Sequence, residues 1–148
     1  MYENTYSTKV KCDIETLYNI LLDLDNYPEI VPHIKKIIYK DRNAKPLKAH
    51  IVLEYLFVKM EYDCDIFFHH EDFSIEVIGY GYSFEHINGY WFLEKISDNE
   101  TKISYKINFK LKSKVQQKIA EKIFDFYGDK LRDKIKSYVE RFLNRRLR

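Results

Sequence analysis

Five histidines are the side chains in this sequence with the most obvious capacity for chemistry, and the clearest grouping is His69-His70-Glu71-Asp72. A metal site or a general acid-base pair needs such groups within reach of one another or of a nucleophile. This tetrapeptide lies between two strand patterns, where a run of polar residues is more typical of a solvated turn than of a metal site. We therefore expect a turn here.

The remaining polar candidates also favour structural roles. Glu61, Asp63 and Asp65 alternate along one strand face, which indicates a solvent-facing row rather than a metal site. His50 and His86 stand at strand starts, and each is expected to be exposed or hydrogen bonded. The sequence contains no nucleophile elbow, phosphate loop, dinucleotide fingerprint or paired-carboxylate pattern. We expect no catalytic residue, no metal and no cofactor beyond a bound ligand.

The cysteine pattern and the N-terminal sequence indicate a cytoplasmic protein. Only Cys12 and Cys64 occur, without the spacing of a disulfide framework or a zinc site. The first ten residues, MYENTYSTKV, lack the features of a signal or transit peptide, and no stretch of about 18 uncharged apolar residues is present. We expect the protein to be neither exported nor membrane-spanning.

Aromatic residues are abundant, with 13 tyrosines and 10 phenylalanines in 148 residues. Such side chains suit the wall of a cavity or an interface, because they combine a large apolar area with, in tyrosine, a hydroxyl group. A codon bias from an AT-rich genome is the alternative explanation. The aromatic residues, rather than the histidines, therefore carry the better functional hypothesis.

The hydrophobic periodicity predicts the elements that must position these aromatic residues. Asp13 is expected to cap a helix that runs to about residue 24, and the stretch LDNYPEIVPHIKK, residues 24–36, then forms a stiff elbow. There Tyr27 and Val31 should be extended because each precedes a proline, although Pro28 could open a short helical turn. We expect strands over residues 2–11, 36–39, 47–58, 60–68, 73–80 and 101–111, and another strand with Phe84, Trp91 and Leu93 between turns or bulges at 79–81 and 88–89.

The C-terminal quarter reads as one long amphipathic helix from about Ser113, with a kink or close approach at Gly128. The element order predicts an α+β fold in a single domain, residues 1–148. A curved antiparallel sheet of six or seven strands should wrap around the long C-terminal helix. A cavity is expected between the sheet and the helix.

Two motifs in this order resemble the coenzyme Q-binding and polyketide-cyclase-like family of the START superfamily. The first comprises Asp23, Tyr27-Pro28, Ile30-Val31 and Pro32, and the second comprises Tyr90-Trp91-Phe92 followed by residues 101–109. The chain departs from the family at His33-Ile34, where members often carry an aromatic residue and then a cysteine. The resemblance covers nearly the whole chain and implies a helix-grip fold that holds a hydrophobic ligand.

The same resemblance implies three functions in order of preference. The first is a non-enzymatic carrier or chaperone, most naturally for ubiquinone, that supports respiratory electron transport. The alternative is a toxin-like module that binds the large ribosomal subunit and blocks subunit association, and the third is a polyketide cyclase or dehydratase. The candidate ligand-binding residues, each of which could equally be ordinary core, are Tyr27, Pro28, Val31, Pro32, Trp91, Tyr105, Phe109, Phe124, Tyr127 and Leu131.

The charge is unevenly distributed along the chain. Residues 1–111 carry 13 Lys/Arg and 18 Asp/Glu, a net charge of −5, whereas residues 112–148 carry 12 and 5, a net charge of +7. This basic end could contact an anionic membrane, at the inner face of which a lipid carrier would work, or ribosomal RNA, or it could be a solvated helix end. The candidate contact residues are Arg141, Arg145, Arg146 and Arg148. The oligomeric state stays open.

Overall fold

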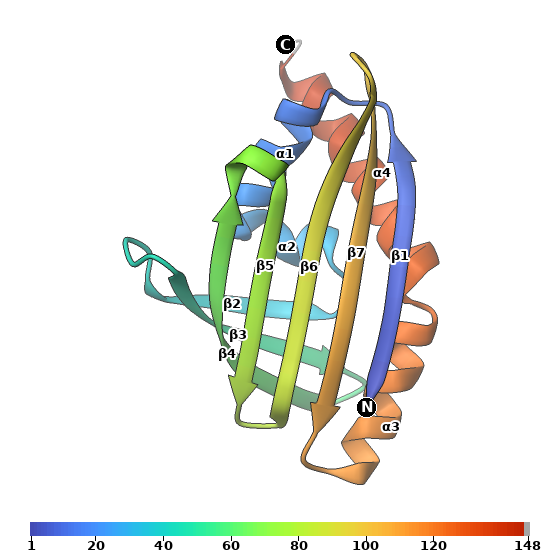
Figure 1. The fold of residues 1–148 in the computed structure, drawn as a ribbon. Helices are drawn as coiled ribbons and strands as arrows, with labels where there is room; N and C mark the ends of the chain where they lie inside the picture. Colours follow the sequence, from blue (N-terminus) through green and yellow to red (C-terminus); the bar gives the residue numbers. More distant parts are fainter. Residues whose placement is uncertain (147–148) are drawn as a thin grey trace.

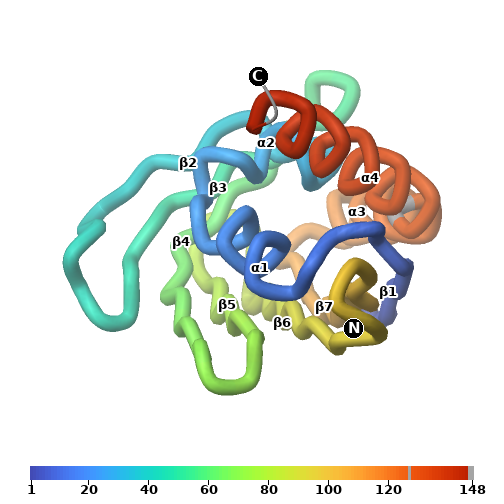
Figure 2. Tube along the Cα trace, turned by 90° about the horizontal axis from the view of Figure 1, so that it is seen from above, coloured from blue at the N-terminus to red at the C-terminus, as the bar shows by residue number. Residues whose placement is uncertain are grey.

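The computed structural model describes residues 1–146, apart from the side chain of Tyr127. Within this part of the chain, a seven-stranded antiparallel sheet has the order β1-β7-β6-β5-β4-β3-β2. Figure 2 shows the sheet as an arc with the helices on its concave side. The α+β helix-grip architecture expected from the sequence is thus confirmed. The strands are β1 (Tyr2–Val10), β2 (Ile34–Asp41), β3 (Leu47–Tyr55), β4 (Val58–His69), β5 (Ser74–Gly81), β6 (Phe84–Ser97) and β7 (Glu100–Leu111).

Four helices and two short 3-10 turns accompany the sheet (Figure 1). They are α1 (Ile14–Leu22), η1 (Leu24–Asn26), α2 (Tyr27–Ile30), η2 (His70–Asp72), α3 (Lys114–Asp125) and α4 (Tyr127–Arg146). As expected, the Asp13 carboxylate caps α1 by accepting a hydrogen bond from the Thr16 N–H, at 3.0 Å. Ser113 caps α3 in the same way, through the Gln116 N–H at 3.2 Å. Among the described residues, no helix is both long and apolar enough to cross a membrane.

The elbow after α1 is a short helix rather than an extended segment. Tyr27 adopts helical angles, φ −63° and ψ −37°, so the expectation that it would be extended was wrong. Pro28 stands in the first turn of α2, where its missing N–H is not needed, and this outweighs the preference of the preceding residue for extended backbone. Val31 is extended, as expected, with φ −98° and ψ 120°. The elbow therefore seats the Tyr27 ring on the inner face.

The long C-terminal helix is broken between α3 and α4, close to the expected kink at Gly128. A Cβ atom on Gly128 would lie 3.0 Å from Cδ1 of Tyr6. The Tyr6 hydroxyl donates a hydrogen bond to the Phe124 carbonyl, and the Tyr2 hydroxyl donates to Oδ1 of Asp125 at 3.1 Å. Two inward tyrosines of β1 thus hold the C-terminal end of α3 against the sheet.

Strand β6 runs without a turn through Asn88 and Gly89, contrary to the expected break at that point. Its register with β7 shifts at two other points, between Phe84 and His86 and between Lys95 and Ser97. At residues 79–81 the expected turn or bulge takes the form of a bulge: β5 continues to Gly81 with a register shift after Gly79, and the turn follows at residues 82–83. Gly81 has φ 84°, which favours glycine there. Gly89 therefore does not serve a turn, and its role lies in the packing of the inner face.

The hairpin between the expected strands 47–58 and 60–68 lies within the apolar run rather than after it, because β3 ends at Tyr55 and β4 begins at Val58. Tyr55 pairs with Val58 across a two-residue loop, Leu56-Phe57, in which both residues have positive φ, 46° and 69°. A loop with two such residues matches the twist of the adjoining strands, although bulky side chains make this backbone costly, by about 1–2 kcal/mol per residue. The run of apolar residues thus spans a turn, because hydrophobicity alone does not mark hairpin loops.

Candidate functional site

A small cavity lies between the inner face of the sheet and the helices. Its volume is about 30 Å³. Strands β2 to β7, the elbow and α3 all contribute to the wall. The lining residues are Tyr27, Val31, Pro32, Ile34, Ile51, Leu53, Tyr62, Val77, Ile87, Trp91, Tyr105, Ile107 and Phe124. Six of them, Tyr27, Val31, Pro32, Trp91, Tyr105 and Phe124, are candidates from the sequence, so the elbow, β6, β7 and α3 do converge on one place.

The wall of this cavity is apolar except for three phenols. No lining residue among the described ones carries a charge. Burial raises the pKa of Tyr27, of Tyr62 and of Tyr105, and it raises the pKa of the nearby Cys64 thiol to about 12. All four groups are therefore protonated near neutral pH. Since all four are neutral, none is poised to act as a base.

Tyr27 and Trp91 form the fixed part of the wall. The Tyr27 hydroxyl donates to the Leu21 carbonyl at 2.7 Å, in the last turn of α1. Its ring meets Trp91 edge-on with 6.2 Å between centroids, and Trp91 lies against Tyr105 at 4.3 Å. The elbow thus positions Tyr27 through helix α1, while neighbouring strands position the other two rings.

Two glycines on the inner face make room for two of the tyrosines. A Cβ atom on Gly89 would lie 2.7 Å from the Tyr105 hydroxyl oxygen. A Cβ atom on Gly79 would lie 2.8 Å from Cδ2 of Tyr62 and 2.6 Å from the Ile87 carbonyl oxygen. All three distances are shorter than real Cβ contacts, so a side chain at either position would displace the neighbouring tyrosine ring or, at Gly79, the Ile87 backbone. The glycines therefore shape the cavity.

Tyr62 is a site residue that sequence reasoning missed. It is 7% exposed, and its hydroxyl has no hydrogen-bond partner among the described residues although its ring lines the cavity. A hydroxyl at a cavity wall with no protein partner is a donor available to a bound molecule. The signal in the sequence was the alternation of β4, which places Tyr62 and Cys64 opposite Glu61 and Asp63. That pattern shows which side chains of β4 share a face, but it does not show that Tyr62 lines the same cavity as the other candidates.

Three other candidates do not line this cavity. Pro28 is half-buried in α2 and is not among the residues that line the cavity. Phe109 is fully buried, and its ring stacks on Tyr2 at 4.9 Å and packs on Phe124 at 5.1 Å. Leu131 lines a separate void of about 10 Å³ between β1 and α4. Trp91 and Tyr105 border both spaces, so this pair separates them.

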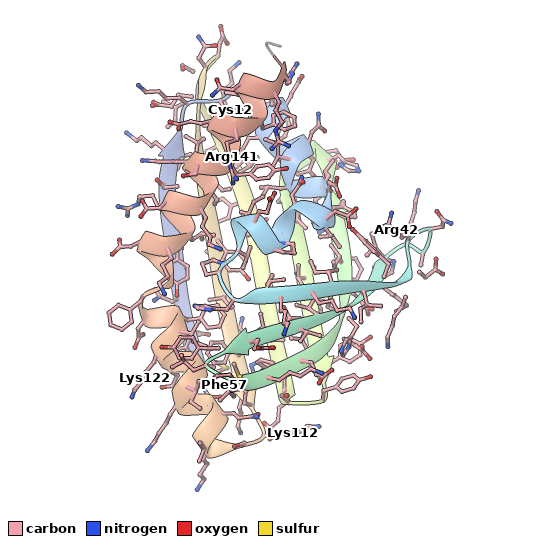
Figure 3. All side chains as sticks on the ribbon, turned by 180° about the vertical axis from the view of Figure 1, so that it is seen from behind. Cys12, Arg42, Phe57, Lys112, Lys122 and Arg141 are labelled. Atoms are coloured by element: carbon pink, nitrogen blue, oxygen red, sulfur yellow. The ribbon has the colours of Figure 1, made fainter. Side chains whose placement is uncertain are left out.

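The basic candidates either do not line the cavity or fall outside the described part of the chain. Arg141, Arg145 and Arg146 are exposed on the last turns of α4, and Figure 3 shows Arg141 at the end of the molecule opposite Phe57. The Arg145 Nε donates to the Arg141 carbonyl at 3.4 Å. Arg148 and the side chain of Tyr127 fall outside the described residues. The structure therefore does not bring the arginines together with the ligand-binding candidates.

The outer face of the sheet accounts for the acidic row and one histidine. His50 is buried, with Nδ1 2.9 Å from Oδ1 of Asp63 and Nε2 2.8 Å from Oε1 of Glu61. Lys40 pairs with Asp63 at 2.7 Å, and Lys48 pairs with Asp65 at 2.8 Å. His50 is thus hydrogen bonded, as expected. Within the described residues, no group of three or more His, Cys, Asp or Glu side chains could hold a metal ion.

The polar turn after β4 is solvated, as expected. His70, Glu71 and Asp72 form η2 and are exposed, and Nδ1 of His70 lies 3.2 Å from the Tyr18 hydroxyl. Tyr18 also donates to the Ser74 carbonyl at 3.2 Å. This contact links the turn to α1 without placing a base near the inner cavity.

Comparison with known proteins agrees with this architecture. A START superfamily protein from Mycobacterium smegmatis superposes with a TM-score of 0.80 at 15% identity, covering 96% of this chain and 99% of that one. The Zhui aromatase/cyclase from Streptomyces sp. R1128 superposes with a TM-score of 0.76 at 11% identity, covering 99% and 96%. Norcoclaurine synthase from Thalictrum flavum gives 0.68 at 10% identity, covering 95% and 87%. At these identities the likeness establishes the fold alone.

No curated protein matches the chain in sequence. Residues 10–136 do match a family of proteins described as polyketide cyclase / dehydrase and lipid transport. That segment begins at the end of β1 and extends into α4, so it contains the whole cavity wall. Because this match spans most of its length, the chain belongs to the family of proteins described as polyketide cyclase / dehydrase and lipid transport.

Proposed function

We propose that the protein binds a prenyl quinone of the ubiquinone type in the inner cavity and carries it without transforming it. One observation carries the proposal: Tyr62, a largely buried residue whose hydroxyl has no protein partner among the described residues, lines a cavity with mostly apolar walls. A quinone offers neutral carbonyl acceptors for such a donor and an isoprenoid tail for the apolar wall. Each buried methylene contributes roughly 0.8 kcal/mol, which supplies affinity without catalysis.

The charge of the site supports an uncharged ligand. A carboxylate or phosphate in this cavity would lose its hydration without meeting a cation from the described lining. A quinone carbonyl needs only a hydrogen-bond donor, and Tyr62 supplies a phenol at the wall. The chemistry of the wall thus matches a neutral ligand with a small polar end.

Binding requires the cavity to expand. Its volume of about 30 Å³ is below the roughly 300–1,000 Å³ of sites that hold organic ligands. Phe124 lines the cavity next to the break between α3 and α4, so separation of this segment from the sheet would enlarge the space. Hydrogen exchange is expected to show opening at residues 120–130, slower when the ligand is bound.

The proposal is tested by titrating the protein with a short-chain ubiquinone while following the fluorescence of Trp91, the only tryptophan. The Tyr62→Phe variant is expected to bind about tenfold more weakly, because one hydrogen bond to the ligand is lost. Tyr80→Phe is the matched control, since Tyr80 donates to Asp65 on the outer face. Equal affinity of the wild type and Tyr62→Phe would show that Tyr62 does not bind the ligand. If the quinone does not quench Trp91 fluorescence in the wild type, the protein does not bind a quinone in this cavity.

A working carrier would reside in the cytoplasm and meet its quinone at the inner face of the membrane. Loss of the protein should impair respiration, and added quinone should restore part of it. Native mass spectrometry of the purified protein should release a prenyl lipid on organic extraction. Normal respiration in a verified deletion strain would count against the proposal.

Cyclase activity is the enzymatic alternative, raised by the family and by the likeness to the Zhui aromatase/cyclase. Proton abstraction from a polyketide would need a base, and the phenols and the thiol at the cavity are protonated near neutral pH. The wall therefore favours binding over cyclisation. Conversion of a poly-β-ketone substrate by the purified protein, abolished in Tyr62→Phe, would reverse this preference.

A second candidate function is binding to the large ribosomal subunit. It is favoured by Arg141, Arg145 and Arg146, which are exposed and make no ion pair within the described residues. Contacts with RNA phosphates would weaken steeply with salt. Co-sedimentation with large subunits, lost when the arginines are replaced by glutamine, would establish this function, and an unchanged gradient profile would remove it.

A further inference from the structure

The loop between β3 and β4 presents two large apolar side chains to solvent. Leu56 is 72% exposed and Phe57 is 99% exposed. Both have positive φ, in a two-residue loop closed by the pairing of Tyr55 with Val58. Phe57 therefore buries no appreciable area within the chain, and it does not stabilise the core.

The fold gives no reason for these residue types. A two-residue loop with positive φ at both positions strongly favours Asn-Gly, because bulky side chains crowd the backbone there. Solvent exposure of leucine and phenylalanine is unfavourable as well. A sequence that breaks both local rules at one point marks a place where function, rather than folding, determines the residues. A contact outside the chain is the function that fits.

The surroundings of the loop are basic. The His33 ring packs edge-on against Tyr55, the residue before the loop, with 5.1 Å between centroids. Lys130 and Lys134 of α4 lie within electrostatic reach of His33, whose pKa is lowered first by burial and then by these two charges. Figure 3 places Phe57 and Lys122 at the same end of the molecule.

Lys122, Lys130 and Lys134 have no counterion within the part of the chain that the structure describes. Every ion pair there that involves a lysine uses one from the strands or their loops, such as Lys35 with Glu54 at 2.7 Å. The stretch 114–146 carries ten Lys/Arg and five Asp/Glu, a net charge of +5. Unpaired cations beside an exposed apolar tip form a surface complementary to an anionic one with an apolar interior.

The loop also adjoins the cavity wall. Val31 and Pro32 line the cavity, and the carbonyl of the next residue, His33, accepts a hydrogen bond from the Glu54 N–H at 3.0 Å. Glu54 lies two residues before Leu56 on β3. A partner seated on the loop would therefore lie next to the elbow that forms one side of the cavity.

We propose that the surface made by Leu56, Phe57, Lys122, Lys130 and Lys134, here called the hairpin-tip surface, docks the protein on an anionic lipid bilayer. Leu56 and Phe57 enter the interfacial layer, and the lysines contact lipid phosphates. This inference rests on the proposed function for its purpose, because a bilayer is where a hydrophobic ligand is collected and delivered. It also moves the membrane contact away from the C-terminal arginines, at the opposite end of the molecule.

Vesicle flotation with the full chain tests the docking surface. Wild type is expected to float with vesicles of phosphatidylcholine and phosphatidylglycerol at low salt, and much less with phosphatidylcholine alone. The double variant Leu56→Asn/Phe57→Gly gives the turn its favoured residues, so it should fold at least as well as wild type. It should lose at least about tenfold in partitioning. Replacing Lys122, Lys130 and Lys134 by glutamine should cost roughly fivefold for each lysine.

Ile96→Ser is the matched control. Ile96 is 44% exposed near the β6–β7 turn, at the end of the molecule where the C-terminus lies (Figure 1), and its loss should leave flotation unchanged. Flotation of Leu56→Asn/Phe57→Gly at the wild-type level would overturn the proposal. So would an equal loss in a variant with Arg141, Arg145 and Arg146 replaced by glutamine, or a protein partner that requires the loop while vesicle binding does not.

The docking result and the proposed function can fail separately. Quinone binding is measured by Trp91 fluorescence without vesicles, and Leu56→Asn/Phe57→Gly should bind with unchanged affinity but deliver quinone to vesicles more slowly. Vesicle binding without any quinone binding would refute the quinone as ligand and support the hairpin-tip surface as a membrane contact. Quinone binding without vesicle binding would refute the hairpin-tip surface as a membrane contact and support the quinone as ligand.

Discussion

The two faces of the sheet near β4 differ in whether their polar side chains have hydrogen-bond partners within the chain. On the inner face, Tyr62 is isolated in apolar surroundings and stays neutral, whereas on the outer face His50 lies between two carboxylates that lysines also contact. Both arrangements arise from the same alternation along one strand. The comparison teaches that a hydrogen-bonded histidine can be structurally complete, while an unpartnered phenol is the group with capacity left for a ligand.

Removing the largest inner side chain should have the largest effect. Trp91→Ala is expected to lower the free energy of unfolding by about 3–5 kcal/mol, because Trp91 is 2% exposed and its removal leaves a void. Urea denaturation followed by circular dichroism measures it, since the variant has no tryptophan. The loss should be insensitive to salt. If Trp91→Ala lowers the free energy of unfolding by less than the outer-face variants do, the inner face does not dominate stability.

The two inner glycines should separate backbone crowding from ring displacement. Gly79→Ala places its Cβ against the Ile87 backbone carbonyl and should destabilise by about 1–3 kcal/mol. Gly89→Ala meets the far end of the Tyr105 side chain, which can move, so it should cost less stability but weaken quinone binding. Thermal melts and fluorescence titration distinguish the two. Equal losses of stability would contradict this division.

The outer network should control how stability depends on acid. The His50 hydrogen bond lowers the pKa of Glu61, and at Asp63 hydrogen bonds from Lys40 and His50 outweigh burial and lower the pKa as well. A depressed carboxylate pKa contributes stability above the ordinary values of 4.5 and 3.8, and this is lost as pH falls through the folded values. Wild type should therefore lose stability between about pH 5 and pH 3.

His50→Gln is the variant that tests this network. It should cost about 1–2 kcal/mol at pH 7, because a charge-assisted contact is lost at each carboxylate. It should also flatten the acid dependence, and urea midpoints at several pH values measure both effects. A slope unchanged from wild type would show that the lysines alone set the carboxylate pKa values.

The smallest expected difference is between two inner tyrosines. Tyr27→Phe should lower the free energy of unfolding by about 1 kcal/mol, since the hydrogen bond to the Leu21 carbonyl is lost. Tyr62→Phe should leave stability within about 0.5 kcal/mol of wild type, because its hydroxyl has no partner to lose among the described residues. Denaturation curves compare them directly. A larger loss in Tyr62→Phe would show that its hydroxyl has a structural role.

Periodicity predicted the sheet, the capped first helix and the break near Gly128, because these follow from side-chain spacing within each element. The Leu56-Phe57 turn and the helical Tyr27 escaped it, since an apolar run does not mark a tight loop and a residue before proline usually avoids helical angles. Among the ligand candidates, Tyr27 and Trp91 converge on the cavity, whereas Phe109 packs elsewhere. Tyr62 was missed because convergence depends on how far the sheet curves.

The pairing of β1 with β7 has a consequence for biosynthesis. Tyr2 lies opposite Phe109 and Val10 lies opposite Thr101, so β1, which is made before the other strands of this sheet, stays unpaired until β7 has been made. At roughly 5–20 residues per second, that delay lasts on the order of 5–20 seconds. The tyrosines of β1 that hold α3 are thus among the last to find their partners. The cavity is therefore completed only near the end of folding, and a nascent chain at this stage is a natural client for chaperones.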